Sequence, residues 1–262
     1  MINSILFLIF ESYYRCMKIE KFILIIIFLV LVQTMWAQRR RPENLPKLDN
    51  QTAHFGYSLG LNSMGFTIRP VQEFLFFDTV FGIETTHYVG FNINMIANLR
   101  ILEYLDVRFL PGLMFGQRDL EYKVMRDTSF RRHTMRIEST FLDFPLLFKY
   151  KAARLNNFRP FLVGGASFRV DLAAQRKVDP TELPKIRLKP LDAYYEVGVG
   201  VDFFLEYFMF GIELKGSFGM FNMVRYDNSE FSEVYQKLNS KMIILSFHFE
   251  GGKIDKIKWW EN

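Results

Sequence analysis

The alternation of apolar and polar residues after residue 50 predicts an all-β fold, an eight-stranded antiparallel transmembrane β-barrel of the outer-membrane type. Three observations lead to this prediction. Residues 91–99 alternate almost without exception, 17% of the chain is aromatic, and the gaps between apolar segments are short and long in turn. Successive side chains of a strand point to opposite faces, so each such strand has one apolar and one polar face. Outer-membrane barrels add an even strand number and aromatic girdles.

The N-terminal region has the layout of a secretory signal peptide. Lys18 and Lys21 precede an apolar run over residues 22–32, and Ala37 is a small residue at the expected cleavage point. The alternative is a membrane-spanning helix. Because such a helix needs about 20 apolar residues, the shorter run here favours cleavage.

The expected translation start is Met17, with the preceding residues as an upstream extension that contains the only cysteine, Cys16. The mature chain would then have no disulfide, thiol nucleophile or thiolate metal site. The predicted organisation is an extension plus signal peptide over 1–37, a periplasmic N-terminal segment over 38–52, the barrel over 53–250 and a periplasmic tail over 251–262.

The first four strands follow from this alternation and from turn residues. Residues 54–68 put Phe55 and Tyr57 on one face and Gly56 and Ser58 on the other. The clearest alternation lies within the second expected strand, and a short gap leads into the third. The expected strands are 54–68, 88–101, 105–125 and 134–150.

The last four strands follow the same rule. The strand over 192–205 has an uncharged face from Tyr195 to Phe203, and a tight turn at 206–207 leads into the next strand. The expected strands are 158–172, 192–205, 208–225 and 240–250. The expected long connections are 67–87, 126–133, 173–191 and 226–239, and the short ones are 102–104, 152–157 and 206–207.

Barrels of this type have short periplasmic turns and longer extracellular loops, which would place both termini in the periplasm. The competing fold is a soluble barrel of the lipocalin type, with the apolar face inside. The polar face carries many glycines, as a crowded narrow interior requires, and the apolar face is almost free of charge. These features favour the membrane. The mature chain has no run of 18 apolar residues, which excludes a helical membrane protein.

Seven charged residues are predicted to point into the lumen. One interpretation is an ion-selective or catalytic lumen. The other is a structural network of paired charges, because eight strands leave an interior that side chains just fill and buried charges must be paired. The second is favoured. The residues are Arg108, Asp143, Lys149, Glu196, Asp202, Glu213 and Lys215.

No catalytic, metal or cofactor site is predicted, and the chain is expected not to be an enzyme. Ser246 and His248 share one strand face, but about 7 Å separates residues at that spacing, too far for direct proton transfer. The net charge of +5 is distributed along the chain, which argues against nucleic acid as a partner. No small-molecule substrate is expected.

The surface segments suggest contacts with the envelope. The basic residues of 126–133 and 173–191 would face outward and attract anionic lipopolysaccharide or bind a partner. The tail, with Trp259 and Trp260 among lysines, would lie on the membrane interface or dock a periplasmic partner. The expected partners therefore include outer-membrane lipid and lipopolysaccharide.

Several segments resemble the PorT family of outer-membrane barrels, over about residues 44–250. They are Asn44-Leu45-Pro46-Lys47 with His54 to Asn62, Asn98-Leu99-Arg100 with Asp106 to Gly112 and Gln117 to Tyr122, and Glu138 to Lys151 with Asn156 to Phe161. The resemblance implies participation in the type IX secretion system, which moves folded cargo with C-terminal sorting domains across the outer membrane and in some bacteria supports gliding motility. It implies an accessory or assembly role through contacts with other secretion components, and no catalytic residues.

Three hypotheses remain open. The favoured one is a non-enzymatic barrel serving type IX secretion. The second is a small structural or adhesive barrel with a generic envelope role, and the third is a lipid-modifying outer-membrane enzyme that would use Ser246 and His248.

Overall fold

The computed structural model describes residues 43–49, 51–71, 80–126, 129–173, 186–226 and 234–251. The expected leader, the tail beyond Gly251 and parts of all four expected long loops lie outside these residues. The elements are β1 (Ala53–Pro70), β2 (Val80–His87), β3 (Val89–Arg100), β4 (Leu105–Phe109), β5 (Gly112–Arg126), β6 (Ser129–Lys151), β7 (Phe158–Asp171), β8 (Arg187–Leu188), β9 (Leu191–Phe204), β10 (Met209–Gly219), β11 (Val224–Arg225), β12 (Tyr235–Glu250) and the short helix α2 (Pro46–Asp49).

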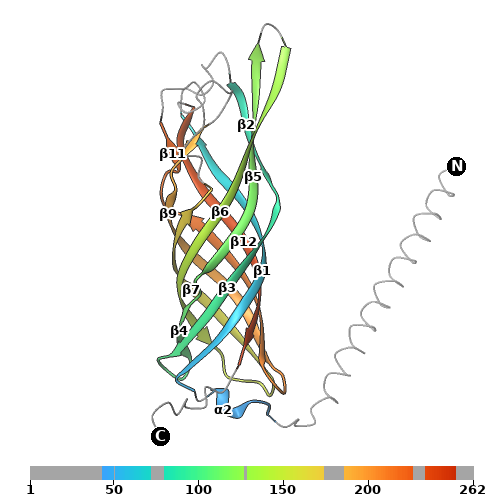
Figure 1. Cartoon of the computed structure of the whole chain (residues 1–262), viewed down its shortest axis with the longest axis vertical. Coiled ribbons are helices and arrows are strands. Elements are labelled where there is room, and N and C mark those ends of the chain that lie inside the picture. Colours follow the sequence, from blue (N-terminus) through green and yellow to red (C-terminus); the bar gives the residue numbers. More distant parts are fainter. Residues whose placement is uncertain are drawn as a thin grey trace, which may run out of the picture. The chain divides into compact units, whose positions relative to one another are not determined.

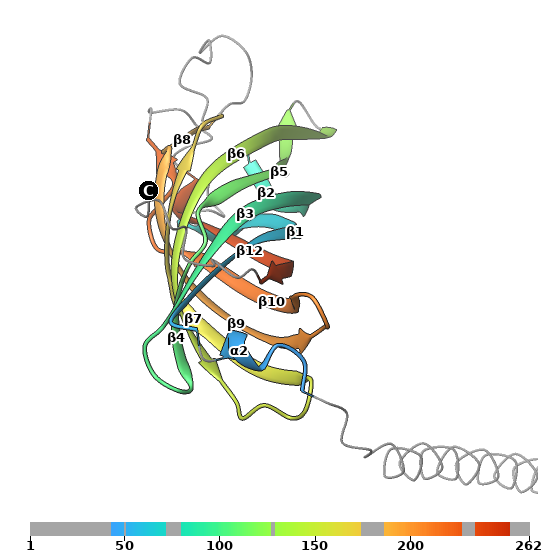
Figure 2. The ribbon, with the colours of Figure 1, turned by 60° about the horizontal axis from the view of Figure 1, so that its bottom comes forward.

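The strands close into a ring of eight, with every neighbouring pair antiparallel (Figures 1 and 2). The second strand of the ring consists of β2 followed by β3, and the third strand consists of β4 followed by β5. The ring closes because β1 pairs with β12 on one side and with β3 on the other. The predicted eight-stranded antiparallel barrel is therefore confirmed. No helix within the described ranges is long and apolar enough to span a membrane.

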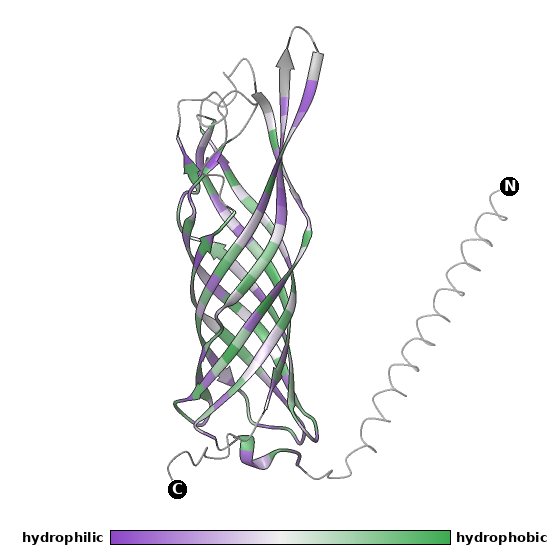
Figure 3. Cartoon of the chain, viewed as in Figure 1, coloured by the Kyte–Doolittle hydropathy of each residue, from purple (hydrophilic) through white to green (hydrophobic). Residues whose placement is uncertain are grey.

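Side chains are distributed as the membrane interpretation requires and opposite to a lipocalin-type barrel. Large apolar residues cover the outside, with Met95 71% and Val199 54% exposed, whereas Ser58, Asn94 and Glu196 are buried inside. Figure 3 shows this alternation along each strand. Aromatic residues gather near the end that carries the short turns, as an interfacial girdle does. They are Tyr104, Tyr150, Phe158, Phe203, Tyr207 and Phe208.

Two predicted loops are replaced by strand, one over most of its length and the other at both of its ends. The expected loop 126–133 is wrong, because β5 and β6 stay paired up to Arg126 opposite Ser129. The expected loop 67–87 is shorter, since β1 continues to Pro70 and β2 begins at Val80. The upper parts of β5 and β6 project beyond the apolar band of the barrel, where their outer faces meet water. Charged residues such as Arg131 and Arg132 therefore interrupt the alternation without ending the strand.

Three strand limits also differ. The third strand is divided at Leu110-Pro111, since proline has no N–H for the ladder. The seventh ends at Gly219, and its expected end at 225 instead forms β11, which pairs with β8. Between the two strands the side-chain oxygen of Asn222 accepts hydrogen bonds from the N–H groups of Val224 and Leu238. The eighth begins at Tyr235 instead of residue 240.

Above the apolar band the ring opens. The β1 and β3 strands pair only as far as Ser63 opposite Val89, and beyond that point β1 pairs with β12 alone and β2 with β5 alone. His87 lies at the junction, where its Nδ1 donates to the Met64 carbonyl at 2.8 Å. Among the described residues, β2, β5 and β6 thus form a three-stranded sheet, and its β5 and β6 strands reach farthest at the top of Figure 1.

Two adjacent glycines provide a test of the strand faces. An added Cβ at Gly165, which points inward, would lie 2.3 Å from the Leu146 carbonyl oxygen, whereas at outward-pointing Gly164 the nearest atom is 3.9 Å away. We expect Gly165→Ala to lower the free energy of unfolding by about 1–3 kcal/mol and Gly164→Ala to be nearly neutral. The measurement is the folded fraction on a gel against urea concentration. Equal effects of the two variants would contradict the inward placement of Gly165.

Candidate functional site

The lumen near the short-turn end is filled by a chain of buried charges. Arg108, which is 0% exposed, donates to Glu250 at 2.7 Å and to Glu213 at 3.3 Å. Each of these carboxylates also meets a histidine, with His54 2.7 Å from Glu250 and His248 3.2 Å from Glu213. The Arg108 guanidinium on β4 thus connects carboxylates of β10 and β12 across the lumen, and Glu250 extends the connection to His54 on β1.

Two lysines of β6 complete this layer. Lys149 lies 2.6 Å from Asp202 on β9, and its ammonium sits 3.9 Å from the centre of the Phe161 ring. Lys151 lies 2.6 Å from Asp106 on β4, whose other carboxylate oxygen accepts from the Asn98 amide. Because each ammonium faces a carboxylate from another strand, these contacts tie β3, β4, β6 and β9 together.

A second charged layer lies midway along the barrel. Arg169 on β7 donates to Asp143 at 2.9 Å, to Ser217 at 2.9 Å and, on its other arm, to Glu196. Lys215 lies 2.8 Å from the second oxygen of Glu196 and 3.9 Å from Glu213, which joins this layer to the first. A guanidinium with several donors in a fixed plane suits such a multiple bridge better than a lysine.

All seven residues predicted for the lumen lie in these two layers, buried and in ion pairs. Sequence reasoning missed six others that share the same inward faces. Their signal was available, because Arg169 follows the apolar Phe168 and Glu250 follows the apolar Phe249, so alternation places each of them on the opposite, polar face. The missed residues are His54, Asp106, Lys151, Arg169, His248 and Glu250.

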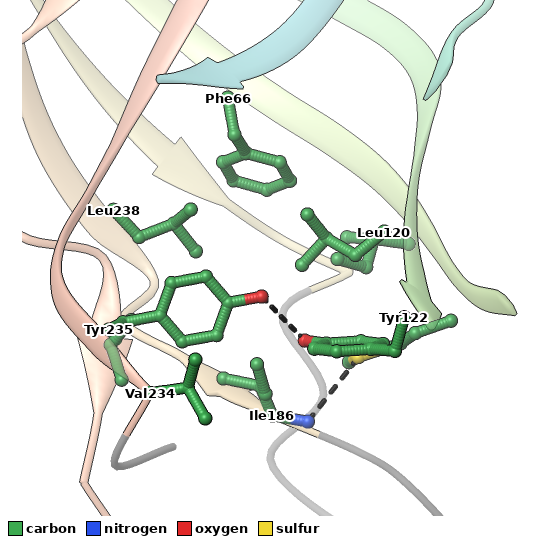
Figure 4. Packing of buried hydrophobic residues seen from close by; sticks show 10 residues of the cluster. Phe66, Leu120, Tyr122, Ile186, Val234, Tyr235 and Leu238 are labelled. Carbon is green, nitrogen blue, oxygen red and sulfur yellow. Dashed lines mark hydrogen bonds between the residues drawn. The ribbon is translucent and has the colours of Figure 1, made fainter. Parts of the chain in front are cut away.

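Arg118 marks the upper limit of the polar lumen. Its guanidinium donates to Ser240 at 2.5 Å and lies 4.2 Å from the centre of the Phe66 ring and 5.3 Å from that of Phe141. Above it the interior becomes apolar, in an upper cluster that Figure 4 shows. The buried members are Phe66, Leu120, Tyr122, Met135, Ile137, Ile186, Val224, Val234, Tyr235 and Leu238.

Two polar contacts lie within the upper cluster: the Tyr235 hydroxyl donates to that of Tyr122 at 2.7 Å, and the Ile186 N–H donates to the Met135 sulfur at 3.3 Å (Figure 4). Burial raises the pKa of both phenols, so both stay neutral and the hydrogen bond persists over the physiological pH range. Outside this cluster the same strands carry polar residues, among them Thr67, Arg136 and Glu138. The projecting end is therefore built like a water-soluble β-structure, with the arrangement of the membrane part reversed.

The short-turn end is covered by the segment around α2. Leu48 packs with Phe204 and Met209, while Asn44 accepts a hydrogen bond from Arg154 and donates to the Phe204 carbonyl. Both ends of the lumen are thus closed by side chains, one by this segment and the other by the upper cluster. Such an interior does not provide a water-filled path.

Catalytic chemistry has little geometric support. Ser246 and His248 both lie inside the barrel, and His248 contacts Glu213, while no hydrogen bond joins it to Ser246 among the residues described. Within the same residues, no group of histidine, cysteine, aspartate and glutamate is arranged to hold a metal ion. The arrangement is suited to holding the strands together.

The chain was compared with protein families, curated proteins and solved structures. Residues 36–225 match the family described as outer membrane protein beta-barrel domain. Neisserial surface protein A shares 12% identity over 76% of this chain and 99% of its own, with a TM-score of 0.38. OprG from Pseudomonas aeruginosa shares 9% identity over 76% and 91%, with a TM-score of 0.41. Ail of Yersinia pestis shares 10% over 76% and 99%, with a TM-score of 0.36. No curated protein matches the chain.

Proposed function

The chain belongs to the family of outer membrane protein beta-barrel domains, and from that premise we propose that it is a non-enzymatic accessory or assembly component of type IX protein secretion. The closed and charge-paired lumen carries the proposal, because a barrel that does not conduct must act by contact. Type IX secretion is proposed as the process because of the PorT-like segments, which include the stretch from Glu138 to Lys151.

The surfaces available for contact are the outer wall, the projecting sheet of β2, β5 and β6, and the end that carries α2. With the short turns in the periplasm, the projecting sheet would stand outside the cell. Other secretion components in the same membrane would then meet the barrel along its wall or at this sheet. Lipopolysaccharide would surround the base of the sheet.

A clean deletion tests the proposal. We expect proteins with the C-terminal sorting domain to accumulate in the periplasm and to fall in the medium, because the translocation machinery lacks a component. Both pools are quantified by immunoblot, with a periplasmic marker as the control for leakage. A gene that starts at Met17 should restore export, which also tests the start codon.

Normal export in the deletion strain would contradict the secretion role and favour a generic envelope barrel. An altered lipid A composition, restored by the wild-type gene but not by Ser246→Ala, would favour an enzyme instead.

A further inference from the structure

The outer wall of β1 and β12 changes from apolar to basic just above the apolar band. Ile243, which is 63% exposed, is the last apolar residue that β12 directs outward before this change. Farther up, the outward residues of β12 include two lysines, and those of β1 end at an arginine. They are Lys241, Asn239 and Lys237 on β12, which lie opposite Gly65, Thr67 and Arg69 on β1. We refer to Arg69, Lys237 and Lys241 together as the basic wall.

The cations of the basic wall lie beside like charges or neutral residues. Arg69 is directly opposite Lys237 across the two strands, and like charges in this position repel each other and destabilise a sheet. Lys241 is opposite Phe218 on β10 and a glycine on β1. Among the residues that the structure describes, no carboxylate forms an ion pair with any of the three cations.

The projecting sheet provides a contrast within the same molecule. There Lys123 forms an ion pair with Glu84, and Arg136 lies opposite Asp119, so these cations have carboxylates of the chain beside them. The basic wall keeps a net positive charge on its described residues. An anion from outside the chain would reduce the repulsion between Arg69 and Lys237, which is the charge complementarity that favours binding at a surface.

The position of the basic wall indicates which anion it meets. Directly below it lie lipid-facing residues, among them Ile243 and Phe218, whose ring stacks on that of Tyr195. With the short turns in the periplasm, this height corresponds to the headgroups of the outer leaflet. Lys237 and Lys241 are separated by about 13 Å along the strand, a spacing that allows one large headgroup to bring a phosphate to each of them.

We propose that the basic wall binds the phosphorylated sugar headgroup of a lipopolysaccharide molecule. The phosphates accept charge-assisted hydrogen bonds from Arg69, Lys237 and Lys241, and the acyl chains lie along the apolar band below, beside Ile243. The site lies outside the basic segments 126–133 and 173–191, to which the sequence pointed for this contact. It is independent of the secretion role.

The test uses the purified full chain in non-ionic detergent and bisphosphorylated lipid A, the phosphorylated disaccharide lipid that anchors lipopolysaccharide. Native mass spectrometry over a lipid titration gives the dissociation constant. We expect the double variant Lys237→Gln with Lys241→Gln to weaken binding about tenfold, from the loss of two partly exposed ion pairs. The matched control is Lys47→Gln with Lys123→Gln, which removes the same charge elsewhere and should bind like the wild type. A gel shift on heating shows that each variant is folded.

A comparison of lipids tests the chemistry of the ligand. Lipid A without phosphates should bind the wild type about as weakly as bisphosphorylated lipid A binds the double variant, and added salt should weaken the binding of the phosphorylated form. The proposal is overturned if the double variant binds like the control or if removal of the phosphates has no effect. Equal binding of phosphatidylglycerol would also overturn it, because the wall would then attract any anionic lipid. None of these results affects the deletion experiment, which measures export in cells.

Discussion

Replacing Arg169 by methionine is expected to lower the free energy of unfolding by about 3–5 kcal/mol, because it leaves buried carboxylates without their main cation. Arg169 is 0% exposed and bridges Asp143, Glu196 and Ser217. Lys215 still faces Glu196, whereas Asp143 forms no other ion pair among the described residues and interacts with Lys215 only at longer range. The measurement is urea unfolding in lipid vesicles, followed by gel mobility without boiling.

Lys123→Met is the matched control. It removes an equally close ion pair, that of Lys123 with Glu84, which lies in water on the projecting sheet. The lysine lowers the pKa of Glu84 through this contact, but solvent screens such pairs and stability should change little. The double variant Arg169→Met with Asp143→Asn should recover part of the loss, since it removes the uncompensated charge. Wild-type stability of Arg169→Met would show that the lumen pairs are dispensable.

Phe66→Ala is expected to open the projecting end while the membrane barrel stays folded. Phe66 is 1% exposed, belongs to the upper cluster and lies against the Arg118 guanidinium. Truncating a buried phenylalanine costs about 3–5 kcal/mol. The cluster lies above the apolar band, so this cost is expected to be local, and elements of low stability open independently of the rest.

Limited proteolysis distinguishes local from global opening. Cleavage within the projecting sheet should become faster in Phe66→Ala, while the heat-dependent gel shift of the protected barrel remains. Thr67→Ala, at the exposed neighbouring position, should digest like the wild type. If the gel shift is lost together with protease resistance, the upper cluster and the barrel unfold as one unit.

The membrane part of the barrel could be predicted from the sequence because the lipid imposes one rule on every strand. An outward residue is apolar and an inward one is small or polar, so a period of two reveals the strand and its face. This rule located residues 91–99 and assigned all seven predicted charges to the interior. The same rule could have placed Arg169 and Glu250 in the interior as well, since it only requires knowing on which face of the strand each residue falls.

The projecting end could not be predicted in the same way. There the outer face meets water and the inner face packs on the upper cluster, so the strand over 129–138 carries charges outside and Met135 and Ile137 inside. Read with the membrane rule, the first part of this stretch was predicted as the loop 126–133, while residues 134–138 were correctly assigned to the fourth strand. The alternation continues through this stretch and indicates a strand, but here the apolar residues face inward and the polar residues face outward.

The sequence by itself determined the fold class, the strand number and the faces of the membrane strands, because these follow from the local alternation of side chains. Only the tertiary structure decided which charges meet, since Arg108 and Glu250 are joined across the lumen by the closure of β1 on β12. It also decided that the upper cluster closes one end and that Arg69 and Lys237 lie side by side on the outer wall. Both depend on which strands lie side by side, and that is set by contacts between residues far apart in the chain.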